Sequence, residues 1–242
     1  MTVAALYDVH GNLPALEAVL AEVDADTILA GGDVVLGPMP RETLALLRER
    51  GATFIRGNTD RAVGGGVPED DPWLERVHWV RDQLDEDDLD FLRTLPHPLS
   101  LAVDSLGQVL FCHGSPRSDE EILTAATPPK RLDPILDGVQ ERVVVCGHTH
   151  VQFDRLVGDR RLVNAGSVGM PYEGEAGIAC WALLGPDVEL RRTRYDAEHA
   201  AAGVRGSGMP GADEFAQEYV LHPATAEEAT THFEALASGS ES

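Results

Sequence analysis

Apolar residues in the first sixty positions of the chain recur in a pattern that predicts alternating strands and helices. Short apolar runs at Val3–Tyr7, Thr27–Ala30 and Ala52–Arg56 are typical of buried strands. Between them, apolar residues three or four positions apart predict two helices, one beginning after Asn12 and the other over Pro40–Arg50. A strand–helix–strand–helix–strand order is typical of a parallel sheet with helices on its faces, so we expect an α/β protein.

The rest of the chain shows patterns that predict further helices, hairpins and a helical end. Helices are expected at Trp73–Leu84 and Asp87–Leu95, and a buried strand at Arg142–Val145. Alternating residues predict three antiparallel pairs: Leu99–Val103 with Gln108–Phe111, Gln152–Val157 with Arg160–Val163, and Ile178–Leu184 with Glu189–Arg194. We expect one domain over residues 1–242, with a core at about 3–195 and a helical C-terminal appendage at about 196–237. Three roles are open for that appendage: it covers the functional site, it mediates dimerisation, or it packs on a sheet.

The charge of the chain restricts the ligands that it attracts. Lysine and arginine total 19 against 41 acidic residues, which gives a net charge of −22, and Lys130 is the only lysine. Such an acidic protein repels polyanions at long range, so duplex nucleic acid is not expected as a partner. A small anionic substrate remains compatible with this charge if a local positive charge attracts it.

The hydropathy and the cysteines predict a cytoplasmic protein with no membrane partner. No uncharged apolar run approaches the roughly 18 residues that a membrane span needs, and the N-terminal segment is too short and uncharged for a signal peptide. Cys112, Cys146 and Cys180 are an odd number of cysteines without CxxC spacing, which is typical of free thiols in a reducing compartment. A homo-oligomer is also compatible with the sequence.

Polar residues that bind metals follow most of the predicted strands. The carboxyl ends of strands in open α/β sheets are where ligand sites form, so we expect these side chains to meet: Asp8, His10, Asp33, Asn58, His113, His148 and His150. Seven nitrogen and oxygen ligands without a thiolate suit two divalent ions, for which Mn, Fe, Zn, Ni and Co are candidates. A carboxylate has two oxygens, so Asp33 is expected to bridge the ions. Two aspartates and a hydroxide leave such a pair of ions with a single positive charge, which attracts phosphate.

Five motifs in this order resemble those of the calcineurin-like metallophosphoesterases. They are Asp8–Asn12, Gly32-Asp33, Gly57–Asp60, His113-Gly114 and Gly147–His150, and Asn164–Ser167 is similar to a further element of the family. The resemblance covers roughly residues 3–195 and implies an αββα sandwich of two mixed sheets flanked by helices. It also implies one ion held by Asp8, His10, Asp33 and His150, and another held by Asp33, Asn58, His113 and His148.

The resemblance implies a phosphoesterase in which a metal-bridging hydroxide attacks the phosphorus of a small phosphoester. The residues expected to take part in catalysis are Asp33, Asn58, His113, His150 and Asp60. Asp60 is alternatively a helix cap. Candidates for substrate binding are Asn12, Arg61, Arg117 and Tyr172; for the two arginines the alternative is surface salt bridges, and for Tyr172 it is structural packing.

One position departs from the usual pattern of the family. Many members carry a histidine after the Gly-Asn pair, where it protonates the leaving oxygen, but this chain has Thr59. The sequence is similar in this respect to a small bacterial and archaeal branch that includes phosphodiesterases, so a phosphodiesterase is expected. The alternatives are a phosphomonoesterase, which includes a nucleotidase, a dinucleoside polyphosphatase or a protein phosphatase, and a non-catalytic scaffold on the same fold.

Overall fold

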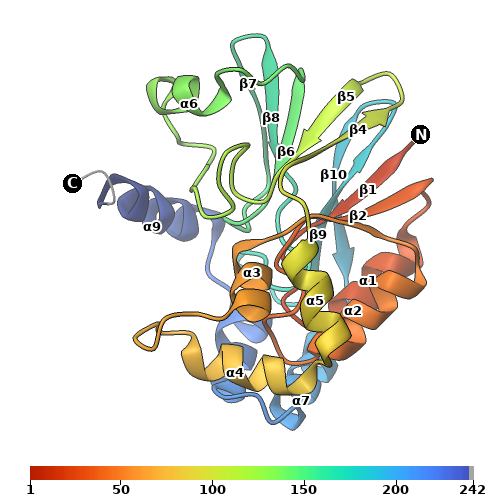
Figure 1. Ribbon diagram of the computed structural model, residues 1–242, viewed down its shortest axis with the longest axis vertical. Helices are drawn as coiled ribbons and strands as arrows, with labels where there is room; N and C mark the ends of the chain where they lie inside the picture. The colour runs from red at the N-terminus through yellow and green to blue at the C-terminus, as the bar shows by residue number, and fades with distance from the viewer. Residues whose placement is uncertain (240–242) are drawn as a thin grey trace.

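Two mixed five-stranded sheets pack face to face in the computed structural model, which describes residues 1–239 (Figure 1). The first sheet has the order β10-β9-β1-β2-β3, and its strands are β1 (Val3–Leu6), β2 (Thr27–Ala30), β3 (Thr53–Phe54), β9 (Ile178–Leu184) and β10 (Val188–Arg194). The second has the order β4-β5-β6-β8-β7, and its strands are β4 (Leu99–Val103), β5 (Gly107–Phe111), β6 (Val143–Cys146), β7 (Phe153–Val157) and β8 (Arg160–Asn164).

Each sheet combines three strands paired in parallel with two strands paired antiparallel, which lie on one side of the first sheet and at both edges of the second. In the first sheet β1, β2 and β3 run parallel, and β9 is antiparallel to β1. In the second, β5, β6 and β8 run parallel between antiparallel β4 and β7. Parallel neighbours bring their carboxyl ends to the same edge of a sheet. The loops after β1 and β2 therefore start at one edge of the first sheet, and the loops after β5 and β6 start at one edge of the second.

Apolar layers separate the sheets from each other and from the helices. Between the sheets, Tyr7, Leu29 and Ile55 meet Phe111 and Val145 in one buried cluster. The outer face of the first sheet is covered by α1 (Leu13–Glu22), α2 (Pro40–Glu49), α3 (Asn58–Gly65), α4 (Leu74–Gln83) and α5 (Glu86–Thr94). On the second sheet, α6 (Pro129–Leu136) packs over β5, β6 and β8. The expected αββα sandwich is therefore confirmed.

No helix was predicted over α3, although Asp60 was considered as a helix cap, and β3 is shorter than the five residues predicted for it. Glycine disfavours a helix interior, and α3 contains Gly64 and Gly65. The helix forms because Asp60 accepts the Gly57 N–H at its start, and because Gly64 lets α3 approach α5 closely. A side chain at Gly64 would meet Arg93 and Leu92 at 3.2–3.3 Å.

The C-terminal segment is helical, as expected, and packs in two separate parts. Helix α7 (Ala197–Gly206), α8 (Ala212–Phe215) and the π-helix η1 (Ala216–Leu221) form a buried cluster with Met170. Helix α9 (Ala226–Gly239) extends away from this cluster on the same side of the molecule as α6 (Figure 1). None of the helices within residues 1–239 is both long and apolar enough to cross a membrane.

Helix α9 is mostly exposed, and the half-buried Glu234 attaches it to α6 and to the segment before α6. Glu234 Oε1 accepts hydrogen bonds from the hydroxyls of Thr124 (2.6 Å) and Thr127 (2.8 Å) and from Arg131 Nη2 (2.8 Å). Burial acts to raise the pKa of Glu234, but these three donors outweigh it and lower the pKa below the usual value. The ionised carboxylate therefore stabilises the attachment of α9.

We expect Glu234→Gln to accelerate amide hydrogen exchange in α9 about fivefold at neutral pH, because a charged hydrogen-bond network contributes about 1 kcal/mol at a partly exposed site. Since the folded pKa is depressed, the stabilisation is present above the unfolded value of about 4.3 and is lost as the pH falls through the folded value. Exposed Glu227, changed to Gln on the same helix, is the matched control. Equal exchange in both variants would contradict the prediction.

Candidate metal centre

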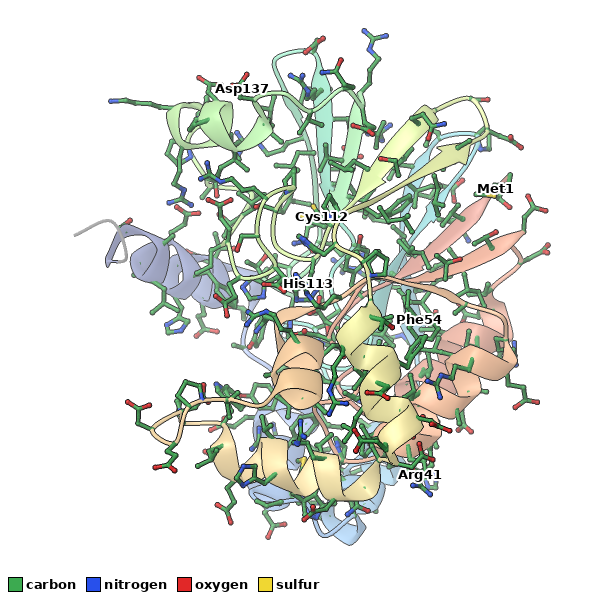
Figure 2. All side chains as sticks on the ribbon, in the orientation of Figure 1. Met1, Arg41, Phe54, Cys112, His113 and Asp137 are labelled. Carbon is green, nitrogen blue, oxygen red and sulfur yellow. The ribbon has the colours of Figure 1, made fainter. Side chains whose placement is uncertain are left out.

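The seven residues that follow strand ends lie together where the two sheets meet. Asp8 and His10 follow β1, Asp33 follows β2, His113 follows β5, and His148 and His150 follow β6. Asn58 begins α3, four residues after β3. Figure 2 shows His113 near the middle of the molecule, between the helices over the first sheet and the loops of the second. The carboxyl ends of strands from both sheets therefore build the site.

Five of these seven residues have left-handed backbone conformations. Their φ angles lie between 45° and 66°, and the residues are Asp8, His10, Asp33, His148 and His150. For residues other than glycine this region costs about 1–2 kcal/mol each, and such strain is found where function requires a particular side-chain direction. The strain turns each side chain out of its strand direction and towards the others.

Two glycines leave room for the aspartates of the cluster. A Cβ at Gly57 would lie 2.0 Å from Asp33 Oδ1, and a Cβ at Gly147 would lie 2.5 Å from Asp8 Oδ2. Neither carboxylate could keep its position beside a larger residue. The glycine in each of these motifs is therefore required by close packing against a carboxylate.

The side chains form two adjacent groups whose donor atoms lie within 4.8 Å of one another: Asp8, His10 and His150 in one, and Asp33, His113 and His148 in the other. In the first group His150 Nε2 lies 3.2 Å from Asp8 Oδ1. In the second, His113 Nε2 lies 3.4 Å from Asp33 Oδ1 and 3.1 Å from Asn58 Oδ1. Asp33 Oδ2 is also 3.7 Å from His10 Nε2, so Asp33 lies between the groups.

Carbonyl groups fix the direction of the imidazoles. The Nδ1 atoms of His10, His113 and His150 lie 2.9–3.1 Å from the backbone oxygens of Leu36, Gly31 and Met170, respectively. A ring that donates its Nδ1–H to a carbonyl presents the Nε2 lone pair on its other side. His148 has the opposite orientation: its Nε2 lies 3.1 Å from the Glu120 oxygen, which leaves Nδ1 to face the cluster.

The cluster has the properties that a cation site requires. Asp8 Oδ1 is buried and has no hydrogen-bond partner in the described part of the chain, and Nε2 of His10 lies only 3.3 Å from Nε2 of His150. An unpaired buried carboxylate oxygen and two facing lone pairs are both unfavourable unless positive charge lies between them. Two carboxylates, one amide and four imidazoles also match the ligand preferences of divalent transition ions.

The shifted pKa values of the clustered side chains also indicate a site for positive charge. Burial acts against ionisation of Asp33, but the imidazoles of His113 and His10 hold the pKa of Asp33 well below its usual range. For His113, burial lowers the pKa, but Asp33 and Asp8 outweigh burial and raise the pKa to about 10. Burial and the charge of His113 lower the pKa of His148 to about 4. The two carboxylates thus attract positive charge strongly.

Asp60 lies behind the cluster and braces its backbone. Its carboxylate is fully buried and accepts N–H bonds from Asp33 (2.7 Å), Val34 (2.9 Å) and Gly57 (3.1 Å). Burial and the nearby charge of Asp33 raise the pKa of Asp60 to about 6. Asp60 therefore caps α3, and it also ties α3 to the loop after β2.

Asn164 and Ser167 brace the loops on the other side. Asn164 Nδ2 donates to the Gly147 oxygen at 2.7 Å. Ser167 Oγ donates to the backbone oxygen of Asp8 at 2.7 Å and accepts the N–H of Met170 at 2.8 Å. The backbone oxygen of Met170 in turn contacts His150. This segment holds the backbone on which Asp8, His148 and His150 depend.

Among the predicted substrate-binding residues, Tyr172 contacts the cluster. Its ring stacks on the His150 ring with centroids 5.4 Å apart, and its ring centroid is 6.2 Å from that of Phe233 in α9. Asn12 is buried, and its side chain binds protein groups: Oδ1 accepts the Ala15 N–H, and Nδ2 donates to the Gly169 oxygen. Asn12 therefore caps α1, the helix that was predicted to begin after it.

The two predicted arginines are held by carboxylates. Arg61 donates to Asp119 at 3.0 and 3.2 Å and to Glu120 at 2.6 Å. Arg117 forms an ion pair with Glu121. The salt-bridge alternative thus describes both side chains in this structure.

Sequence reasoning missed several residues around the cluster. Asp119 is nearly buried and binds both Arg56 and Arg61, and the oxygen of Glu120 contacts His148. The acidic run Asp119–Glu121 next to Arg117 was a signal for such ion pairs. No local pattern marks Phe233, because its contact with Tyr172 spans 61 positions.

Comparison with known proteins finds relatives over most of the chain. Residues 1–184 match the family model described as the calcineurin-like phosphoesterase superfamily domain. An uncharacterised protein of Methanocaldococcus jannaschii, MJ0912, is 26% identical over 235 residues, which cover 86% of this chain and 93% of that protein.

Solved structures agree with this match. A metallophosphoesterase from Sphaerobacter thermophilus is 27% identical with a TM-score of 0.73, and the match covers 90% of this chain and 97% of that one. Hypothetical protein PH1004 from Pyrococcus horikoshii is 20% identical with a TM-score of 0.80, and the match covers 93% of this chain and 99% of that one. This second match shows that the fold is shared. The chain therefore belongs to the calcineurin-like phosphoesterase superfamily, which implies metal-dependent hydrolysis of phosphoesters.

Proposed function

We propose that this protein is a phosphodiesterase that depends on two divalent metal ions and acts on small phosphoesters. The observation that carries the proposal is the pair of adjacent histidine–aspartate groups with Asp33 between them. Asp8, His10, Asp33 and His150 would hold one ion, and Asp33, Asn58, His113 and His148 would hold the other. When bound, such ions supply Lewis acidity and lower the pKa of a water molecule.

The protein's own residues orient the donors and exclude competing contacts. Carbonyl groups fix four imidazole rings, and Asp60 fixes the backbone of Asp33 and Gly57. Imidazoles and an amide that hold ions contribute no negative charge, so a pair of ions here would keep positive charge for an anionic substrate. The net charge of −22 supports a small ligand over duplex nucleic acid.

Thr59 supports a diester substrate with a good leaving group. Thr59 follows Asn58 in the chain, and the backbone N–H of Thr59 donates to Asp33 Oδ1 at 2.9 Å. A hydroxyl at this position is too weak an acid to protonate a departing oxygen, whereas an imidazolium would do so. Hydrolysis should therefore favour leaving groups that need little protonation.

With Mn²⁺ present, we expect the rate of diester hydrolysis to fall steeply as the leaving-group pKa rises from phenols to alcohols. Thr59→His should flatten this dependence and raise alkyl-diester rates at least about tenfold, since general acid catalysis contributes about 10²–10⁴. Thr59→Ala is the matched control and should keep the steep slope. Equal rates for aryl and alkyl diesters in the natural protein would contradict the proposal. Faster hydrolysis of mono-aryl than of bis-aryl phosphate would favour a phosphomonoesterase.

We expect Asp33→Asn to lower kcat/KM on bis-p-nitrophenyl phosphate by about a thousandfold, because the variant removes the carboxylate shared by both groups. Asp87→Asn, at an exposed position on α5, removes the same charge far from the donors and is the control. An Asp33→Asn variant with the full rate in Mn²⁺ would disprove the two-ion site. Metal-loaded natural protein that cleaves no phosphoester would indicate a scaffold.

Asp60→Asn should weaken metal binding about 10- to 100-fold without removing a metal ligand, as loss of an outer hydrogen-bond partner usually does. An amide offers one acceptor oxygen where three N–H groups now meet a carboxylate, so the backbone of Asp33 would shift. Calorimetric titration with Mn²⁺ measures the effect, and Asp87→Asn again serves as control. Unaltered affinity in Asp60→Asn would show that Asp60 only caps α3.

A further inference from the structure

A polar cavity lies between α6 and the C-terminal end of α9. Its volume is about 660 Å³, within the range of small-molecule sites. Arg117, Glu120 and Glu121 form one wall, Lys130 and Arg131 of α6 form another, and Ala237 and Ser238 of α9 contribute to the rim. Figure 1 shows α6 and α9 on the same side of the molecule.

One residue, Glu120, belongs to both the cavity wall and the surroundings of the metal centre. Its backbone oxygen lies 3.1 Å from His148 Nε2, and its carboxylate lies 2.6 Å from Arg61 Nη2 in α3. His148 is also partly exposed, unlike Asp8 or His113. A molecule bound at the exposed edge of the metal centre therefore has the cavity as its neighbour.

The charge of the cavity differs from that of the protein as a whole. Three cations and two carboxylates line it, which leaves one excess positive charge in a chain with a net charge of −22. Glu121 binds Arg117, and Glu234 binds Arg131, so these arginines are fixed in place. For Lys130, an exposed ammonium, residues 1–239 supply no carboxylate partner. The unmatched charge of the cavity is therefore that of Lys130.

The remaining walls suit an organic group. Ile122, Pro128 and Pro134 contribute apolar surface, whereas Ile135 is buried in the core beneath them. A free phosphate ion needs far less than 660 Å³ and gains nothing from apolar walls. An arm that combines a ring with a phosphate would use both the volume and the ammonium.

We propose that this cavity binds a phosphate-bearing arm of the substrate, whose scissile phosphodiester lies at the metal centre. The inference rests on the proposed phosphodiesterase function and adds a substrate class to it, namely diesters of nucleotide size with a second phosphate. Lys130 contacts that second phosphate, and Ile122 and the two prolines contact the ring. Lys130 is thus a specificity-determining residue.

The test compares two substrates that differ only in the second phosphate. They are p-nitrophenyl thymidine 5′-phosphate and the same diester with a 3′-phosphate. With Mn²⁺, we expect KM to be about tenfold lower for the 3′-phosphorylated diester, as a charge-assisted contact allows. In Lys130→Gln the ratio of the two KM values should fall to about two, and Lys130→Arg should restore it. Arg142→Gln, which removes an exposed cation outside the cavity, should keep the natural ratio.

A binding measurement keeps the test independent of turnover. Calorimetry with metal-loaded protein should show about tenfold tighter binding of thymidine 3′,5′-bisphosphate than of thymidine 5′-phosphate, and Lys130→Gln should remove this preference. Turnover of both diesters with equal KM, or an unchanged ratio in Lys130→Gln, would overturn the cavity proposal and leave the phosphodiesterase intact. Inorganic phosphate that binds as tightly as the bisphosphate, with the same loss in Lys130→Gln, would assign the cavity to a free anion instead.

Discussion

The burial of two carboxylates close to one another is the constraint on which the rest of this structure depends. Asp8 is fully buried and Asp33 nearly so, and both lie within 4 Å of the same imidazole, that of His113. Like charges in a medium of low polarity are costly unless positive charge and hydrogen bonds surround them. The four histidines, the directions set by their carbonyl partners and the orphaned oxygen of Asp8 all satisfy this requirement when cations are present.

The fold supplies the strained backbone that this arrangement needs. Each non-glycine residue in the left-handed region costs about 1–2 kcal/mol, and five of the seven donors adopt it. Such strain persists only where the surroundings hold the chain in one conformation. Asp60 holds the loops of the first sheet through three N–H groups, and Asn164 and Ser167 hold those of the second. The side chains of Asp60, Asn164 and Ser167 are buried and bind backbone groups, so they contribute by fixing the backbone geometry of the cluster.

The convergence of these seven side chains was predictable from sequence because its signals are local. A polar residue beside glycine at the end of an apolar run marks a strand end, and parallel strands bring such ends together. Helix α3 was missed because the close packing of Gly64 against α5 is a contact that the local sequence does not reveal. Arg61 was expected to meet phosphate, but Asp119 lies 58 positions away and takes its guanidinium. The contact of Phe233 with Tyr172 is likewise long-range, so α9 could be predicted as a helix but not placed.

The overall acidity of the chain makes local positive charge decisive for any anionic ligand. At physiological ionic strength exposed charges are screened over about 8 Å, so distant carboxylates weaken the approach of an anion more than its final contacts. Neutral imidazoles preserve the charge of bound ions, and the ion pairs around Arg61, Arg117 and Arg131 fix guanidiniums without adding net charge. Lys130 is different, because its charge has no such partner among residues 1–239. A ligand that reaches both the metal centre and Lys130 would thus meet the charge of the bound ions and an ammonium that no carboxylate neutralises within the cavity.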